Sequence, residues 1–109
     1  MNTLRKSIEQ EKISPFFISW SKLEDEISLL LSKRDGSAVL PMKKGIAVYK
    51  ALLEQCSTEE ESLIPLNNAE RLAFVDENHS TYAAFRQLQE LFNEMHKKIA
   101  SKRAMLERQ

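Results

Sequence analysis

Glycine and proline are scarce in this sequence, which has two glycines and three prolines among its 109 residues. All-β folds place a turn about every 8–12 residues, and those turns depend on glycine, proline and small polar residues. The shortage therefore disfavours a β-sandwich or a β-barrel. Two isolated glycines also cannot form the glycine-rich loop that cradles a nucleotide phosphate.

Cysteine and long apolar segments are also lacking. The single cysteine, Cys56, excludes an intrachain disulfide framework and suits a reducing compartment. No apolar run approaches the ~20 residues that a membrane-spanning helix needs. The N-terminal residues, MNTLRKSIEQEK, contain no hydrophobic segment of the kind found in signal peptides. We therefore expect a soluble protein of the cytoplasm.

Amphipathic helices are what the sequence does contain. From Ser80 to the end there is no glycine or proline, and apolar residues recur at helical spacing as Phe85, Leu88, Phe92, Met95, Ile99 and Leu106. This pattern predicts a long last helix that begins at a Ser80 cap. Lys102 takes the apolar stripe position after Ile99, so we expect the packed part to end near Ala100. Residues 101–109 would then fray or project.

Two further long helices are predicted from capping signals and apolar stripes. Ser14 and Pro15 form a good helix start. That helix should run to about Lys33, and Gly36 is the glycine expected just after its end. Pro41 opens another helix, which should run to about Gln55. A single helical turn is plausible over 57–64, and a short helix is predicted over 68–76. Residues 1–13 should be partly helical and frayed.

These elements predict an all-α fold, an antiparallel bundle of four to five helices with short loops and a long C-terminal helix. The length suits one domain over residues 1–109. The predicted core consists of Phe16, Trp20, Ile27, Leu30, Ile46, Tyr49, Leu53, Leu72, Phe74, Phe85, Leu88, Phe92 and Met95.

Residues that could support catalysis or bind a metal are few and badly spaced. His79 and His96 lie 17 residues apart and Cys56 stands alone, which matches no zinc-site spacing. The Glu-x-x-His pattern of di-iron bundles is absent. Cys56 should lie near a helix C-terminus, where the dipole opposes a thiolate. We therefore predict no metal, no cofactor, no catalytic residue and no enzymatic activity.

Charge is balanced overall but uneven along the chain. Lys and Arg total 16, as do Asp and Glu, so the net charge is zero. Seven acidic residues and one basic residue occupy 54–77, whereas five basic residues and one acidic residue occupy 97–108. These segments could simply be solvated faces that complement the helix dipoles. They could instead dock a protein partner or a second copy, or contact nucleic-acid phosphates.

The function predicted from these features is that of a non-catalytic protein-interaction module. Beyond Ala100, an exposed apolar cluster is the candidate contact for a partner or a homodimer, and it consists of Ala104, Met105 and Leu106. The alternative is weak, sequence-independent nucleic-acid binding through a basic loop and tail. Its candidate phosphate contacts are Lys33, Arg34, Lys43, Lys44, Lys50, Lys97, Lys98, Lys102 and Arg103.

Residues 65–99 resemble the YpoC-like family, small proteins of Gram-positive bacteria. The residues that carry the resemblance are Pro65 and Leu66, the run Glu70-Arg71-Leu72-Ala73-Phe74-Val75, and Tyr82, Phe85, Leu88, Glu90, Leu91 and Phe92. The resemblance implies a helical fold and a bacterial cytoplasmic setting. It implies no activity and no site residues.

Overall fold

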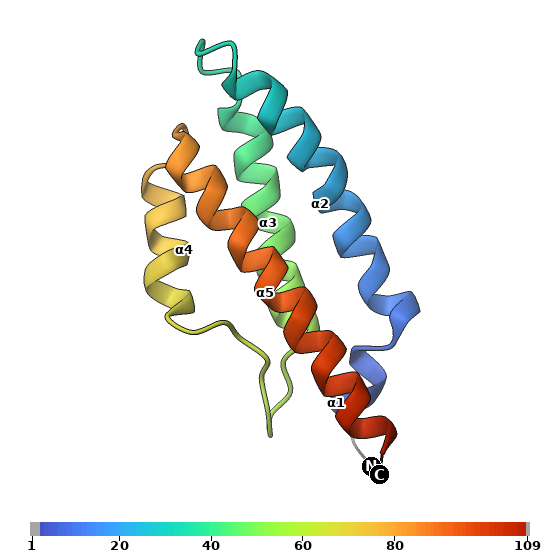
Figure 1. Ribbon diagram of the computed structural model, residues 1–109. Coiled ribbons are helices and arrows are strands. Elements are labelled where there is room, and N and C mark those ends of the chain that lie inside the picture. The colour runs from blue at the N-terminus through green and yellow to red at the C-terminus, as the bar shows by residue number, and fades with distance from the viewer. Residues whose placement is uncertain (1–2, 109) are drawn as a thin grey trace.

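The computed structural model describes residues 3–108 and has five helices in this range (Figure 1). They are α1 (Thr3–Ser7), α2 (Gln10–Leu31), α3 (Val39–Gln55), α4 (Asn68–Glu77) and α5 (Tyr82–Glu107). The described residues form no β-strand, and their one bridge joins Ser57 to Ser62. The predicted all-α class and the long C-terminal helix are therefore confirmed.

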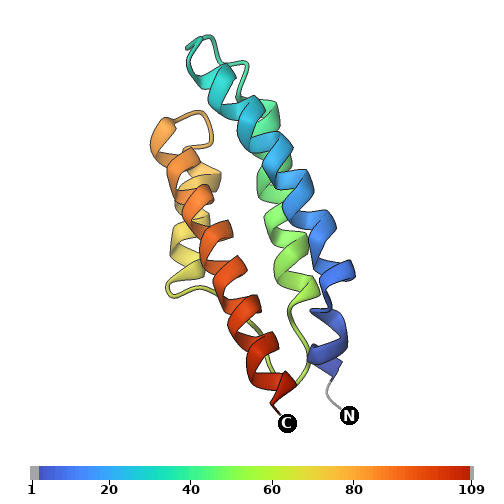
Figure 2. The same ribbon diagram turned by 45° about the vertical axis from the view of Figure 1, so that its right-hand side comes forward.

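The helices form an elongated bundle that measures 51 × 26 × 17 Å. Helices α2 and α3 run antiparallel side by side, α5 lies across the pair, and α4 packs beside α5 (Figures 1 and 2). The α2–α3 loop lies at one end of the long axis, and the two chain ends lie together at the other. No helix in the described part of the chain has the length and hydrophobicity to cross a bilayer.

Aromatic rings form the centre of the core where α2, α3 and α5 meet. Trp20 of α2 stacks on Phe92 of α5, with ring centroids 4.3 Å apart and planes 7° apart. Tyr49 of α3 meets the edge of Phe92 at 5.2 Å, and Phe17 approaches from α2 at 6.2 Å. Gly45 of α3 lies against the Trp20 indole, where an added Cβ would come within 2.9 Å of Cζ3. One glycine therefore sets how closely α3 approaches this stack.

Most of the predicted core is confirmed, and the prediction is wrong for one residue, Phe74. Eight of its members are buried, namely Trp20, Ile27, Ile46, Tyr49, Phe85, Leu88, Phe92 and Met95. Phe16, Leu30, Leu53 and Leu72 are partly buried against them. Phe74 is 41% exposed, because α4 turns Val75 towards the bundle, and the residue before it points about 100° away. A ten-residue helix with one fully buried side chain covers little of the core.

Helix starts differ from the predicted positions by up to five residues. Helix α2 begins at Gln10, so Pro15 lies inside it rather than at its first position. The missing Pro15 N–H affects only the carbonyl of Glu11, which lies in an exposed first turn. The earlier start brings Ile13 into the core. At α5 the cap is Thr81 rather than Ser80, and its hydroxyl accepts the Ala84 N–H at 3.1 Å.

Residues 57–64 were expected to form a helical turn, and this prediction is wrong. The segment is a loop that folds back on itself, with the Leu63 N–H donating to the Cys56 carbonyl at 3.0 Å. The Thr58 hydroxyl caps the Glu61 N–H, which it accepts at 3.1 Å. No apolar stripe follows this cap, so no helical face is available for burial.

The two terminal segments pack on each other, which corrects the expectation that the bundle ends near Ala100. Helix α5 continues to Glu107, and Leu106 is only 4% exposed. Leu4 and Ile8 of the N-terminal segment are buried in the same core. Arg103 Nε donates to the Ile8 carbonyl at 2.6 Å, and Gln55 Nε2 donates to the Ser7 carbonyl at 2.7 Å. Residues 1, 2 and 109 of the predicted frayed segments lie outside the described range.

Candidate binding site at one end of the bundle

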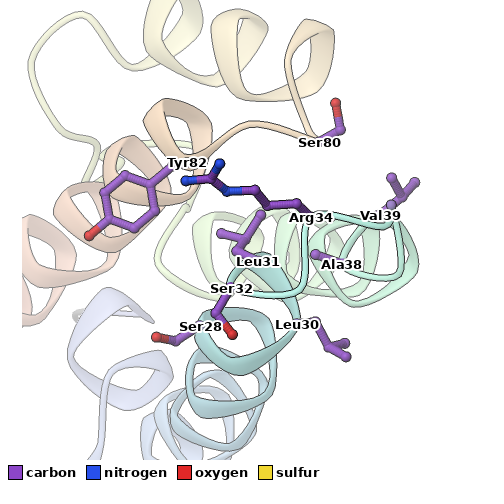
Figure 3. A pocket seen from close by; sticks show the side chains of 10 residues that line it. Ser28, Leu30, Leu31, Ser32, Arg34, Ala38, Val39, Ser80 and Tyr82 are labelled. Carbon is purple, nitrogen blue, oxygen red and sulfur yellow. The ribbon is translucent and has the colours of Figure 1, made fainter.

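An open cleft of about 780 Å³ lies at the end of the bundle that carries the α2–α3 loop. It is bounded by the last turn of α2, the loop, the start of α3 and the start of α5 (Figure 3). Its polar lining consists of Ser28, Ser32, Arg34, Ser80 and Tyr82. Apolar side chains, among them Leu30, Leu31 and Val39, line the rest.

The groups in this cleft suit an anionic ligand with an apolar part. Figure 3 shows the Arg34 side chain extending across the cleft towards Tyr82. A guanidinium binds carboxylates bidentately, and nearby hydroxyls can donate further hydrogen bonds. The lining contains no His, Cys, Asp, Glu or Lys that could act as a base on a serine hydroxyl. The cleft therefore has groups that can bind an anion.

The loop holds Arg34 in an uncommon backbone conformation. Helix α2 ends at Leu31, and its last turn tightens through bonds from the Lys33 and Arg34 N–H groups to the carbonyls of Leu30 and Leu31. Arg34 then adopts a left-handed φ of 55°, and Gly36 follows with a φ of 81°. The sequence predicts Gly36 as the left-handed residue that ends the helix. In the structure the first left-handed residue after α2 is Arg34.

An Asx turn completes the loop around Arg34. Asp35 Oδ1 accepts the Ser37 N–H at 3.0 Å. Hydrogen bonding from Ser37 holds the pKa of the Asp35 carboxyl below its ordinary value. An ionised Asp35 therefore shapes the loop at neutral pH, and it is the single acidic residue between Ser32 and Ile46.

Replacing Arg34 with glycine should stabilise the protein. A left-handed non-glycine residue costs about 1–2 kcal/mol, and the greater freedom of glycine in the unfolded chain offsets about half of that. We expect a net gain of about 0.5–1 kcal/mol in the free energy of unfolding, measured by urea denaturation. Arg34→Ala, which removes the cation but keeps the Cβ, should give no such gain. Equal stability of the two variants would contradict this explanation.

The chain segments that line the cleft also carry exposed apolar and basic side chains. Leu29, Leu40 and Tyr82 are 64%, 63% and 62% exposed. Lys33, Lys43 and Lys44 are exposed as well, and in the described part of the chain neither they nor Arg34 forms an ion pair. We call this surface, residues 28–44 with 80–82, the basic end.

The other predicted phosphate contacts do not join the basic end. Lys50 pairs with Asp76 at 3.4 Å, and Lys102 pairs with Glu61 at 2.6 Å. Arg103 is engaged by Ile8 and by Gln10, whose Oε1 accepts from Nη1 at 2.7 Å. Lys97 and Lys98 are exposed on the half of α5 that approaches the chain termini (Figure 1). The structure therefore places the basic loop and the basic tail towards opposite ends of the molecule.

The predicted contact cluster at the C-terminus is only partly on the surface. Met105 is 51% exposed and Ala104 is exposed, whereas Leu106 is buried. The expected exposure of Leu106 is therefore wrong, because the N-terminal segment covers it. A partner contact through Ala104 and Met105 stays a prediction.

A polar cluster that sequence reasoning missed fastens α4 to the bundle. Arg71 of α4 forms a bidentate ion pair with Glu94 of α5, in which Nη1 lies 3.1 Å from Oε1. The buried Tyr49 hydroxyl donates to Asn68 Oδ1 at 2.5 Å, and burial raises the pKa of this phenol. Arg71 and Glu94 are 23 residues apart, so no local spacing indicated the pair. The four side chains of this cluster bond to one another in two pairs, so we assign the cluster a structural role.

The Arg71–Glu94 pair predicts a pH-dependent contribution to stability. The hydrogen bond from Arg71, more than the attraction of its charge, lowers the pKa of the Glu94 carboxyl. Glu94 is 38% exposed, so solvent screening limits the effect of Glu94→Gln to about 1 kcal/mol at pH 7. A lowered folded pKa gives stability that is present above the unfolded value of about 4.5 and lost as the pH falls. Urea unfolding should therefore show the variant and the native protein converging below pH 4 or so. A difference that is constant with pH would contradict this assignment.

The remaining candidate ligands are far from forming a metal site. The described residues contain no group of three His, Cys, Asp or Glu side chains that could hold an ion. Cys56 is fully buried, and burial raises the pKa of its thiol to about 11. His96 lies with its ring 5.0 Å from that of Phe17, edge to face, and His79 bonds the Asp76 carbonyl at 2.9 Å. The contacts of Cys56, His96 and His79 are therefore contacts within the fold.

Together, the fold and the cleft define a small all-helical protein with an anion-compatible cleft at one end. The chain belongs to the YpoC-like protein family, whose sequence model matches residues 10–107. The match extends well beyond the 65–99 segment that carried the resemblance, and it includes the basic end. No curated protein and no solved structure shows significant similarity to the chain.

Proposed function

We propose that the protein is a non-catalytic interaction module of the cytoplasm, and that its basic end binds an acidic, partly apolar segment of a partner protein. The observation that supports this most is the combination at one end of three exposed large apolar side chains and four cations without ion pairs among the described residues. Exposed apolar groups ringed by polar residues are typical of interaction sites. Uncompensated cations select an acidic partner.

Binding is favoured over catalysis by the contents of the cleft. Arg34 and the hydroxyls can orient a carboxylate, and Leu30, Leu31 and Val39 can cover an apolar side chain beside it. A hydrolytic or transfer reaction would need a base or a nucleophile with a partner, and the cleft lining supplies neither. The single thiol of the sequence, that of Cys56, lies in the core.

A protein partner is favoured over nucleic acid by the distribution of charge. Phosphate-backbone binding needs a continuous basic surface. Here the cations are divided between the two ends of a 51 Å molecule, and three of the nine candidates are already engaged by Asp76, Glu61 and the Ile8 carbonyl.

A peptide selection tests the proposal. A random peptide library displayed on phage is selected on the native protein, and the recovered peptides are measured by titration against the native protein and Arg34→Ser/Tyr82→Ala. We expect peptides rich in Asp and Glu next to Leu, Ile or Phe, which bind the double variant at least about tenfold more weakly.

The control for this selection is Met105→Ser, which alters an exposed apolar side chain of the C-terminal candidate contact and should leave binding unchanged. Recovery of no peptides, or of peptides whose affinity is unaffected by the double variant, would refute the proposal. Loss of binding in the control alone would move the site to the C-terminal helix.

A further inference from the structure

We infer that a second copy of this chain supplies the acidic segment, which is the loop of residues 57–66 (the acidic loop). The inference rests on the proposed function of the basic end and names its partner. In this arrangement the acidic loop of one copy lies on the basic end of the next copy.

The acidic loop has the composition that the basic end requires. Residues 54–70 contain five acidic side chains and no basic one, whereas residues 32–46 contain four basic side chains and one acidic one. Within the loop, Glu59 and Glu60 are exposed, and in the described part of the chain neither forms an ion pair. The loop thus offers two free carboxylates to the four free cations of the basic end.

Apolar exposure supports the same pairing of surfaces. Leu66, next to the loop's Pro65, is 76% exposed, and Ile64 is 52% exposed. Together with Leu29, Leu40 and Tyr82, they account for five of the eight large apolar side chains that the described chain leaves exposed. An association that covers both surfaces removes most of this apolar area from water.

The fold prevents the two surfaces from meeting within one molecule. The α2–α3 loop lies at one end of the long axis (Figure 1). The acidic loop precedes α4 and extends towards the opposite end, where the chain termini lie. The backbone of the acidic loop is closed on itself by the Cys56–Leu63 and Thr58–Glu61 hydrogen bonds, so the loop cannot reach across the 51 Å bundle. Contact between two different surfaces is a heterologous interface, which gives open head-to-tail chains unless the rotation closes a ring.

A charge-swap experiment tests this arrangement by sedimentation velocity of the full-length chain. One variant reverses the basic end (Lys33→Glu, Arg34→Glu, Lys43→Glu), and another reverses the acidic loop (Glu59→Lys, Glu60→Lys). All five side chains are exposed, so the variants should fold, and circular dichroism verifies this. Lys97→Glu/Lys98→Glu is the matched control, because it reverses two exposed cations outside both surfaces.

The native protein and the control should sediment faster as concentration rises, and added salt should weaken this effect. Each reversed variant alone should stay monomeric at concentrations at least about tenfold higher. An equimolar mixture of the two reversed variants should associate again, because each surface then meets one of opposite charge.

The outcomes separate this inference from the proposed function. A native protein that stays monomeric throughout, an association that neither reversal weakens, or a mixture that fails to associate would each refute the second copy as partner. If the second copy is refuted but peptides selected on the basic end still require Arg34 and Tyr82, the proposed function stands and the partner is a different protein. If neither peptides nor self-association depend on the basic end, both are wrong.

Discussion

Replacing Phe92 with alanine should lower the free energy of unfolding by about 4 kcal/mol, the largest effect we expect from any single truncation. The ring is 1% exposed and contacts three other aromatic rings, those of Trp20, Tyr49 and Phe17. Truncation of a buried phenylalanine costs about 3–5 kcal/mol, and loss of an aromatic pair adds about 0.5–1.5 kcal/mol. Domains of this size are stable by only about 5–15 kcal/mol, so a large part of the total would be lost.

Phe74→Ala is the matched control for Phe92→Ala. Its ring is 41% exposed on α4, and sequence periodicity alone had placed it in the core. We expect a loss below about 1 kcal/mol, since much of the ring is already in water. Urea denaturation followed by circular dichroism measures both variants. Equal losses in the two variants would mean that the Trp20–Phe92 stack is not the centre of the core.

Replacing Gly45 with leucine should lower the free energy of unfolding by about 2 kcal/mol, the second largest effect. An added Cβ would lie 2.9 Å from Trp20 Cζ3 and 3.3 Å from Leu88 Cδ2. The Trp20 indole cannot move away freely, because it is stacked on Phe92 at 4.3 Å. Overpacking costs about 1–3 kcal/mol, whereas leucine has a helix propensity better than glycine by ~0.8 kcal/mol. At this site the steric cost outweighs the gain in propensity.

Ala47→Leu provides the comparison for Gly45→Leu, since Ala47 lies two residues further along α3 and is exposed. It should change stability by less than about 0.5 kcal/mol. Thermal unfolding of both variants would show a large drop in Tm for the Gly45 variant and almost none for the Ala47 variant. A Gly45 variant as stable as the native protein would contradict the close approach of α3 to Trp20.

The same aromatic residues connect the core to the cleft. Tyr82 meets Phe85 edge to face at 6.2 Å, Phe85 lies 6.3 Å from Trp20, and Trp20 stacks on Phe92. The packing of α5 on α2 therefore fixes the distance between Tyr82 and the loop that carries Arg34. Variants that weaken this stack should weaken binding at the basic end as well as stability.

Helical periodicity was enough to predict the long helices, because apolar residues that recur every three or four positions must share a face. It misplaced Phe74, since α4 is short and its apolar run Leu72-Ala73-Phe74-Val75 fits more than one face. It also ended the bundle at Ala100, because Lys102 interrupts the stripe. In the fold Lys102 pairs with Glu61 and Leu106 is covered by the N-terminal segment. Both partners are more than 40 residues away in the sequence, beyond the reach of any local pattern.

The candidate site was only partly predictable. Lys33, Arg34, Lys43 and Lys44 were recognised as a basic group, but the sequence offered no reason to separate them from the basic tail. The cleft depends on Ser80 and Tyr82, which lie more than 40 residues after Arg34 and reach it only through the packing of α5. The left-handed conformation of Arg34 was hidden because Gly36, two residues later, is the more usual residue for that role.

The most direct test of the basic end as a binding surface is an NMR titration of the ¹⁵N-labelled protein with a short synthetic peptide of Glu and Leu residues. Binding at the basic end predicts saturable amide shifts confined to residues 28–44 and 80–82, and Arg34→Ser/Tyr82→Ala should raise the peptide concentration at half-saturation at least about tenfold. Shifts centred on residues 97–106, or no saturable shifts at all, would contradict the account.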